Sequence, residues 1–459
     1  MKKFFGDKNF YKMVLTVAIP IIVQNFITNF VNMLDNIMVG QTGTEQMSGV
    51  AIVNQLLFVF NLATFGAISG PGIFTAQYVG QKNPKGIRYT VRYKFYSIIF
   101  ILLVGIPVMF FFRNGLISLF LTESDAGIDL MATLEYAKKY LYVMLVGQLP
   151  FCVTQVYAGT LRESGETKLP MIAGISAVVV NLIGNYILIF GHFGAPRLGV
   201  VGAAIATVIS RFVELGIVVG WTHAHKESNE WVVGLYESIK IPGELAGKIT
   251  IKGMPLLFNE FLWSLGMSML TQCYSTRGID VVAAFNISNT IVNLFNVALI
   301  SMGNVVAIII GQALGSGNME EVVDTDRKLI TFAILLSLGM GVILFFTSPL
   351  FPRFYNTTED IKALAVKLMR EAAIFMPLGS YLNATYFTIR SGGKTFITFL
   401  FDSVYLWVIC WPLAFVLSRF TDVPILTMYF IVLSLDFIKA AIGTVMLSKK
   451  IWIQDLVSE

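Results

Sequence analysis

Five carboxylates lie inside long apolar stretches of this sequence, where an ionised acid is costly to hold. They are Asp35, Glu214, Glu260, Asp402 and Asp436. At membrane depth a carboxylate has to be neutralised, paired or hydrated, so each one needs an explanation. A group that can gain or lose a positive charge is also what couples an ion gradient to another process. These acids are therefore the candidate chemistry of the chain.

Three of the acids have no basic residue within one helical turn. Burial of Asp35 or Glu260 favours either the protonated carboxyl or the binding of a cation, so we predict a cation-coupling role for both. The alternatives are that Asp35 is solvated near a helix end and that Glu260 is a hydrated helix-packing group. Asp402 lies about two turns from the cytoplasmic side, where water or a contact with Lys394 would also explain it. Asp402 is therefore a secondary candidate.

The other two acids have a base three residues away. Glu214 follows Arg211, and Asp436 precedes Lys439. Residues three apart share a helix face, so each acid can be neutralised locally. We predict that these four residues form structural ion pairs.

The composition predicts an integral membrane protein. Of 459 residues, 56% are hydrophobic and only 13% are charged, and the mean hydropathy is +0.72. Soluble domains carry nearly twice that share of charge, at about 25%. The apolar residues fall in blocks of about twenty, the length that crosses a bilayer as a helix.

Twelve such blocks predict an all-α protein with twelve transmembrane helices. They fall near residues 12–40, 49–79, 93–112, 134–160, 169–191, 199–221, 249–275, 281–312, 328–348, 364–390, 395–418 and 423–447. An even number of spans places both termini on one side, and Lys and Arg are more frequent in the loops of that side. By the positive-inside rule, we predict a multi-pass cell membrane protein with both termini in the cytoplasm.

The longest polar segment divides the spans into six and six. We predict an N-terminal lobe over residues 1–221, a cytoplasmic linker over 222–248, a C-terminal lobe over 249–447 and a cytoplasmic tail over 448–459.

An internal repeat supports this division. A shift of 235 residues superposes residues 20–83 on 255–318 without a gap. It matches polar residues that are scarce in membrane segments: Asn54 with Asn289, Asn61 with Asn296, Gln77 with Gln312 and Asn83 with Asn318. Each lobe has an even number of helices, so both copies share one orientation and form a pseudo-symmetric pair.

A proline lies inside the first helix of each predicted lobe. Pro20 and Pro255 are equivalent under the repeat, and each removes a backbone hydrogen bond and permits a bend. The two interpretations are a hinge for alternating access and a static kink.

Several other classes of protein lack support in the sequence. Three distant cysteines and the pair His223 and His225 do not form a metal site. The glycine-rich residues 311–317 lack the Lys-Ser/Thr ending of a phosphate-binding loop, and no basic patch with aromatic residues predicts nucleic-acid binding. We therefore expect neither an enzyme nor an ATP-driven pump, and no metal or cofactor.

Short motifs are spread over nearly the whole chain, at residues 19–20 (IP), 35–40 (DNIMVG), 77–80 (QYVG), 161–168 (LRESGETK), 185–191 (NYILIFG) and 199–207 (GVVGAAIAT). Together they resemble the multidrug and toxic compound extrusion (MATE) family. Each motif is weak alone, but their order, spacing and duplication together are specific.

The resemblance implies a V-shaped pair of six-helix lobes that exports amphipathic, often cationic organic compounds. Export would occur by alternating access in exchange for protons or sodium ions, in a monomer. The alternative is a flippase or exporter of a lipid-linked or polar precursor from the same superfamily. Those proteins commonly have extra helices and a strongly basic cavity, whereas only Arg211 and Lys439 are embedded cations here.

The resemblance also implies the partners of Asp35. One bacterial branch joins a first-helix aspartate to polar groups of the fifth and sixth helices, and the matching positions are Asn181, Asn185 and Thr207. This sequence departs from that branch at Asn185, where a second aspartate is common. The alternative is that the two asparagines, which face one way on their helix, hold helices together. Glu260 is similar to the seventh-helix glutamate of another branch, whose accompanying acid has no counterpart here.

Overall fold

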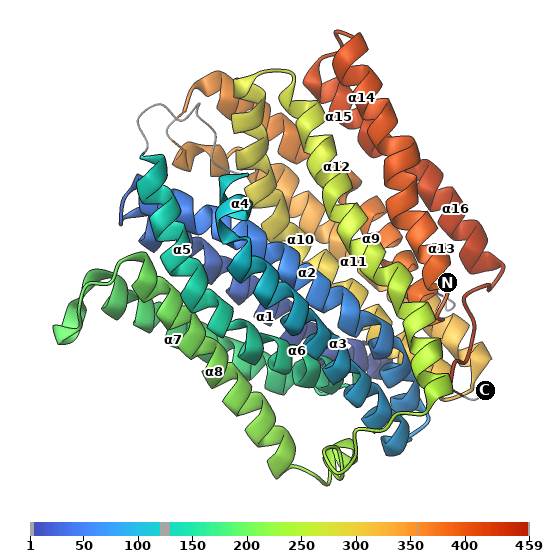
Figure 1. The fold of residues 1–459 in the computed structure, drawn as a ribbon. Helices are drawn as coiled ribbons and strands as arrows, with labels where there is room; N and C mark the ends of the chain where they lie inside the picture. Colours follow the sequence, from blue (N-terminus) through green and yellow to red (C-terminus); the bar gives the residue numbers. More distant parts are fainter. Residues whose placement is uncertain (1–3, 120–128, 356, 458–459) are drawn as a thin grey trace. The chain divides into compact units, whose positions relative to one another are not determined.

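The computed structural model describes residues 4–119, 129–355 and 357–457, and every regular element in these ranges is a helix (Figure 1). The first half contains α1 (Lys8–Gly40), α2 (Thr44–Gly80), α3 (Pro84–Phe111), α4 (Arg113–Ser118), α5 (Leu130–Val146), α6 (Gln148–Glu163), α7 (Lys168–Phe190) and α8 (Val200–Ala224). The second half contains α9 (Gly243–Ser275), α10 (Ile279–Gly315), α11 (Met319–Thr347), α12 (Glu359–Ser391), α13 (Thr395–Phe399), α14 (Trp411–Phe420), α15 (Ile425–Ser434) and α16 (Asp436–Ser448). The predicted all-α fold is confirmed.

The long helices account for the membrane spans. Within the described ranges, nine are long and apolar enough to cross a membrane, and the bent pair of α5 and α6 raises the number to ten. α9 and α12 each have 33 residues, which exceeds the span length, but they carry more charged residues. Counting these two, the spans are consistent with the predicted twelve.

One predicted span is broken rather than continuous. The sequence predicts a single helix over residues 134–160, but the chain bends by 43° between α5 and α6, at Gly147. The reason is Pro150, which has no backbone N–H to donate to the carbonyl of Val146 at the end of α5. At the break, the carbonyl of Gly147 accepts from the backbone N–H of Phe151 and also from the Arg211 guanidinium, at 3.0 Å.

Two compact units make up the chain. One contains Met1–Ile22, Ala76–Lys82 and Thr250–Glu459, and the other contains Val23–Thr75 and Asn83–Ile249. The division falls inside α1, two residues after Pro20, and inside α2 after Thr75. The lobe boundaries proposed from the sequence stay a prediction.

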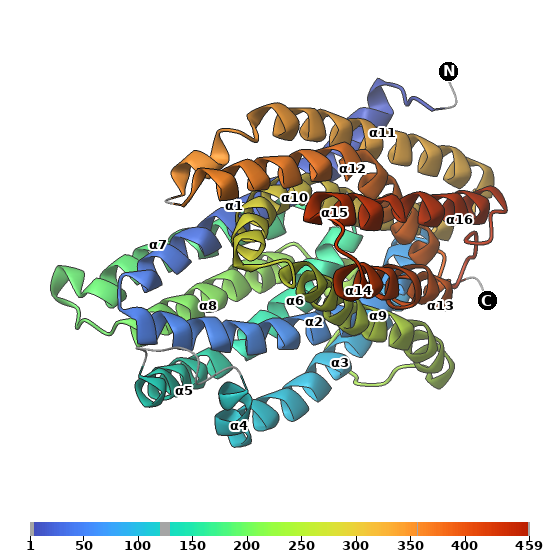
Figure 2. The ribbon, with the colours of Figure 1, turned by 90° about the horizontal axis from the view of Figure 1, so that it is seen from above.

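Helices pack lengthwise inside each unit. In both ribbon views α7 runs beside α8 in one unit, and α11 runs beside α12 in the other (Figures 1 and 2). The first unit has a core of buried side chains from the start of α1, from α10 to α12 and from the C-terminal segment. Burying these stripes of apolar residues holds each bundle together.

The closest helix crossing in the first unit joins repeat-equivalent glycines. A Cβ atom on Gly80 at the end of α2 would collide with the carbonyl oxygen of Gln312 on α10. A Cβ atom on Gly315 would collide in the same way with the carbonyl oxygen of Gln77. Only glycine permits such direct backbone contact, so the matched QxxG positions of the repeat meet each other.

The C-terminal segment is part of this unit. The side chain of Trp452 is buried, and the backbone N–H of Leu456 donates to Oε1 of Gln77 at 2.8 Å. The Gln77 amide nitrogen in turn donates to the carbonyls of Ser391 and Gln454, at 3.0 and 3.3 Å. The described part of the predicted tail is therefore packed against α2 and α12.

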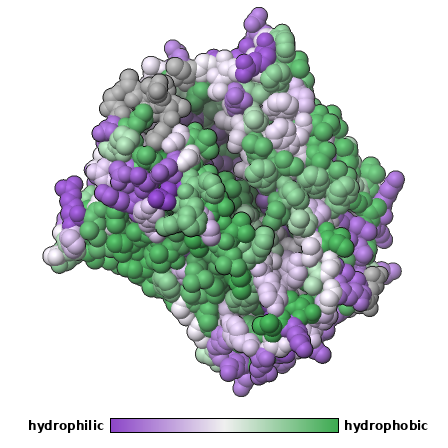
Figure 3. All heavy atoms as spheres, viewed as in Figure 1, coloured by the Kyte–Doolittle hydropathy of each residue, from purple (hydrophilic) through white to green (hydrophobic). Residues whose placement is uncertain are grey.

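The surface of the helices is apolar. Large hydrophobic side chains such as Leu103, Phe346 and Phe437 are exposed on the helix flanks. On the face drawn in Figure 3, hydrophobic residues cover broad areas and hydrophilic residues gather toward helix ends. Such apolar flanks are stable in lipid, so the protein is a multi-pass membrane protein.

Candidate functional site

The packing of α7 on α8 positions the polar residues of the site. A Cβ atom on Gly184 would lie 2.8 Å from the Cβ of Ala206, and one on Gly202 would meet the backbone of Leu188. These small residues let the two helices approach closely. The close approach sets Asn181 and Asn185 of α7 beside Thr207 of α8.

The four residues that the family resemblance selected lie together. The Asn185 amide donates to Oδ1 of Asp35 at 2.7 Å and to Oδ1 of Asn181 at 3.2 Å. The Asn181 amide donates to the Thr207 hydroxyl at 3.0 Å, and that hydroxyl donates to the carbonyl of Ala203. A single aspartate of α1 is thus joined to the polar face of α7 and α8.

The orientation of one amide changes which oxygens this cluster offers. With the Asn181 side chain turned over, its nitrogen lies 3.0 and 2.9 Å from the two Asp35 oxygens, and its oxygen accepts from Thr207. Oδ1 of Asn185 is buried and has no hydrogen-bond partner among the described residues. Carboxylate, amide and hydroxyl oxygens are the ligands of hard cations, and the carboxylate can take a proton instead.

Asp35 has no counter-ion of its own. No Lys or Arg lies within 4.0 Å of its carboxylate in the described part of the chain. Its charge is therefore met only by amides, which orient it without neutralising it. Such a group can exchange a cation or a proton.

Glu260 lies in α9 among other charged groups. It forms no ion pair within 4.0 Å among the described residues, but Arg390 and Asp402 are near enough to influence its charge. Its neighbour Asn259 is buried and binds Asp402. Glu260 and Asp402 are the candidate acids in the C-terminal half of the chain. They therefore lie in one region of the unit that contains Thr250–Glu459.

The partner predicted for Lys439 is wrong. Its ammonium lies 2.8 Å from Oδ1 of Asp402, and this is its ion pair in the described structure, rather than one with Asp436. Among the described residues, Lys394 forms no ion pair with Asp402. The long side chain of Lys439 reaches from α16 to a neighbouring helix, and spacing along one helix does not reveal such a contact.

The structure shows no direct ion pair between Arg211 and Glu214 among the described residues, although the two groups are near enough to influence each other's charge. The Arg211 guanidinium binds the carbonyl of Gly147 and lies 5.0 Å from the centre of the Phe151 ring. No ion pair within 4.0 Å joins it to Glu214 in the residues that the structure describes. Gly147 lies at the break between α5 and α6, and its carbonyl accepts from the guanidinium in addition to the backbone N–H of Phe151.

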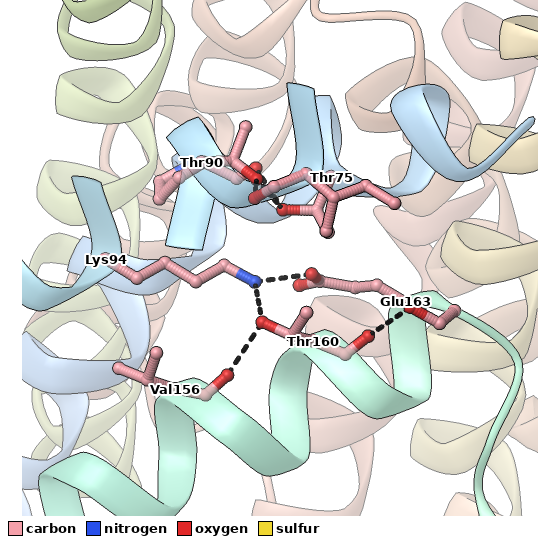
Figure 4. Close-up of polar contacts among 9 residues, drawn as sticks. Thr75, Thr90, Lys94, Val156, Thr160 and Glu163 are labelled. Atoms are coloured by element: carbon pink, nitrogen blue, oxygen red, sulfur yellow. Dashed lines mark hydrogen bonds and ion pairs between the residues drawn. The ribbon is translucent and has the colours of Figure 1, made fainter. Parts of the chain in front are cut away.

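A buried ion pair escaped the sequence analysis. Lys94 of α3 is 1% exposed, and its ammonium binds the carboxylate of Glu163 and, at 3.0 Å, the hydroxyl of Thr160 (Figure 4). The hydroxyls of Thr75 and Thr90 lie 2.8 Å apart beside it. Lys94 stands at the start of a predicted span, where a lysine is normally solvated. The motif at residues 161–168 was the available signal, since it contains Glu163.

Both prolines lie where the sequence places them. Pro20 is inside α1 and Pro255 is inside α9, the first long helix of each half. Their role as hinges stays a prediction.

Comparisons with known proteins agree with the repeat and the fold. A family model described as MatE matches residues 20–187 and again residues 255–416, so the two matches begin at positions that the 235-residue shift makes equivalent. A relative from Thermotoga maritima, named "Probable multidrug resistance protein NorM", is 27% identical over 425 residues, which cover 90% of this chain and 87% of the relative.

Solved structures share the fold at low identity. A crystal structure of a mutant of the Vibrio cholerae MATE transporter VcmN has a TM-score of 0.86 at 15% identity and covers 100% of both chains. A second structure, of the "outward-facing conformation of a multidrug resistance MATE family transporter", has a TM-score of 0.83 at 18% identity and covers 98% of both chains. At these identities the likeness shows the architecture alone.

Proposed function

Because the chain belongs to the MatE family and is a multidrug efflux transporter rather than an enzyme, we propose that it is a secondary antiporter. It exports amphipathic, often cationic organic compounds in exchange for protons or sodium ions, by alternating access. It works as a monomer and needs no ATP or bound cofactor.

The main support for ion-coupled antiport is the environment of Asp35. This carboxylate has no basic partner among the described residues. The Asn185 amide donates to it, and Asn185 is linked through Asn181 to the Thr207 hydroxyl. A proton or sodium ion bound there changes the charge of a half-buried site by one unit. Binding of such an ion can therefore favour one conformation of the transporter over another.

The substrate class has support of its own. A pocket of the second unit is lined by Phe58, Phe65 and Phe151, with Asn61 and Gln155 among them. Aromatic faces attract flat and cationic compounds. Because the pocket has only a few neutral polar groups, it selects weakly among such compounds. A flippase of anionic lipid precursors would instead need cationic groups that are free to bind substrate, whereas Arg211, Lys439 and the buried Lys94 are all engaged.

Efflux from proteoliposomes under imposed gradients tests the proposal. We expect vesicles containing the protein to move ethidium when a proton or a sodium gradient is imposed, because the bound ion supplies the driving force. Imposing each gradient separately identifies the ion, and protein-free vesicles are the control. Transport that needs neither gradient would overturn secondary antiport.

The orientation of the chain is also open to a direct test. Lys and Arg are more frequent in the loops on the side of the termini, which favours a cytoplasmic position for both. We expect a reporter fused after Glu459 to be active only in its cytoplasmic form. A signal from a reporter that needs the outer side of the membrane would reverse the topology.

A further inference from the structure

The span that carries Asp402 is not a regular α-helix. Two five-residue π-helical stretches, Leu400–Val404 and Leu406–Cys410, separate α13 from α14. π-helical turns are rare and occur frequently at functional sites, where the extra residue redirects side chains. The first of these wide turns carries Phe401, Asp402 and Ser403.

Asn259 of α9 fixes this wide turn in place. It is 2% exposed, and its amide oxygen accepts hydrogen bonds from the backbone N–H of Ser403 at 3.3 Å and from the Ser403 hydroxyl at 2.7 Å. Its amide nitrogen donates to Oδ2 of Asp402 and to the Tyr386 hydroxyl, each at 3.2 Å. The asparagine therefore positions the carboxylate and leaves Oδ1 to face another partner.

That partner is the ammonium of Lys439, held in a cage. Nζ lies 2.8 Å from Oδ1 of Asp402, 5.1 Å from the centre of the Phe401 ring and 5.9 Å from the centre of the Tyr405 ring. One carboxylate with two aromatic rings is the arrangement by which proteins recognise ammonium ligands. The side chains of Lys439 and Asp402 are 14% and 19% exposed, so the cage is not sealed.

We propose that Asp402, Phe401 and Tyr405 form a binding site for an alkylammonium group, and that Lys439 occupies this site as a tethered competitor of cationic substrates. An incoming ammonium takes the place of Nζ on Oδ1 of Asp402, and the lysine side chain swings out. The carboxylate is then paired with a cation before and after the exchange, which avoids the cost of a bare buried charge. The competitor role rests on the proposed function, whereas the cage itself does not.

Chemical replacement of the lysine side chain tests the cage. Lys439→Ala removes the ammonium together with the three carbons beyond Cβ, and n-butylammonium is the small molecule that corresponds to the whole lysine side chain. We expect n-butylammonium to raise the melting temperature of the purified variant by several degrees, because a ligand stabilises the state that binds it. Butanol, which lacks the charge, should have no such effect.

Two controls make this result specific. Lys362→Ala removes another paired lysine, whose partner is Glu359 about one turn away on α12, and should show no response to n-butylammonium. The double variant Asp402→Asn/Lys439→Ala should lose the response because the carboxylate is gone. Lys439→Leu, whose side chain cannot donate to Asp402, replaces the alanine variant if that variant does not fold, with methylammonium as its probe. The same stabilisation in the Lys362→Ala control, or none in either Lys439 variant, would overturn the cage.

Equilibrium binding of dansylcadaverine, a fluorescent alkylammonium, tests the competitor role. We expect Lys439→Ala to bind it about tenfold more tightly than the wild-type protein, a difference of about 1.4 kcal/mol. Equal affinity in the two proteins would reject the competition. Neither binding measurement requires transport. If the cage binds these ammonium compounds but the protein does not transport ethidium, the proposed function is wrong and the cage is not.

Discussion

An Asp35→Asn variant is expected to reach the membrane and fold, but to lose transport driven by an ion gradient. Asparagine has nearly the same shape and can still bind Asn185, but it can neither release a proton nor attract a sodium ion. In the ethidium assay, efflux should fall to the level of vesicles without protein. The same loss is expected for Glu260→Gln, whose carboxylate has no ion pair within 4.0 Å in the described structure.

A matched control separates coupling from folding. Asp129→Asn makes the same chemical change at an exposed residue that caps α5, and asparagine caps a helix about as well as aspartate. This control should transport at the wild-type rate. Full gradient-driven transport by both Asp35→Asn and Glu260→Gln would show that neither acid carries the coupling ion.

The sequence revealed features that depend on local pattern. Apolar blocks of span length located the helices, because a membrane span must be both long and apolar. The repeat was visible because polar residues such as Asn61 and Gln77 are scarce in such blocks. The cluster around Asp35 required more than pattern, since only the family resemblance connected that residue with Asn181, Asn185 and Thr207.

The sequence did not reveal contacts between side chains of different helices. Spacing of three residues on one helix predicts a pair of Asp436 with Lys439, but the flexible lysine finds the carboxylate of Asp402 on a neighbouring helix. Nor does an apolar pattern show that a span contains π-helical turns, because the extra residue leaves the composition unchanged. The hydrogen bonds of Asn259 with Ser403 also join two different helices, so the sequence did not reveal them. The repeat shows only that Asn259 matches another polar residue, Gln24.

The break at Gly147 shows an intermediate case. Pro150 was visible in the sequence, but the apolar residues continue past it, so hydropathy alone joined α5 and α6. Only the structure shows that Arg211 binds the carbonyl of Gly147 at the break. Spacing along the helix instead favours Glu214, the nearest acid, as the partner of Arg211.

The buried pair of Lys94 with Glu163 carries the largest expected effect on stability. A Lys94→Met variant removes the ammonium and leaves the Glu163 carboxylate without this ion pair, in a place where a Cβ atom on Gly72 would collide with it. Removing one partner of a buried pair costs about 3–5 kcal/mol. We expect a large drop in the melting temperature of the purified variant.

The double variant Lys94→Met/Glu163→Gln should recover most of this loss, because no charge of the pair is then left buried. Replacing a whole buried pair is often nearly neutral, since desolvation of the two ions offsets their attraction. Lys328→Met, in the more exposed pair with Asp324, should change the melting temperature far less. If Lys94→Met and the double variant melt at the same temperature, the two groups do not stabilise each other. The ion pair would then contribute nothing to the free energy of unfolding. The packing of α3 on α6 would depend on the apolar side chains around the pair.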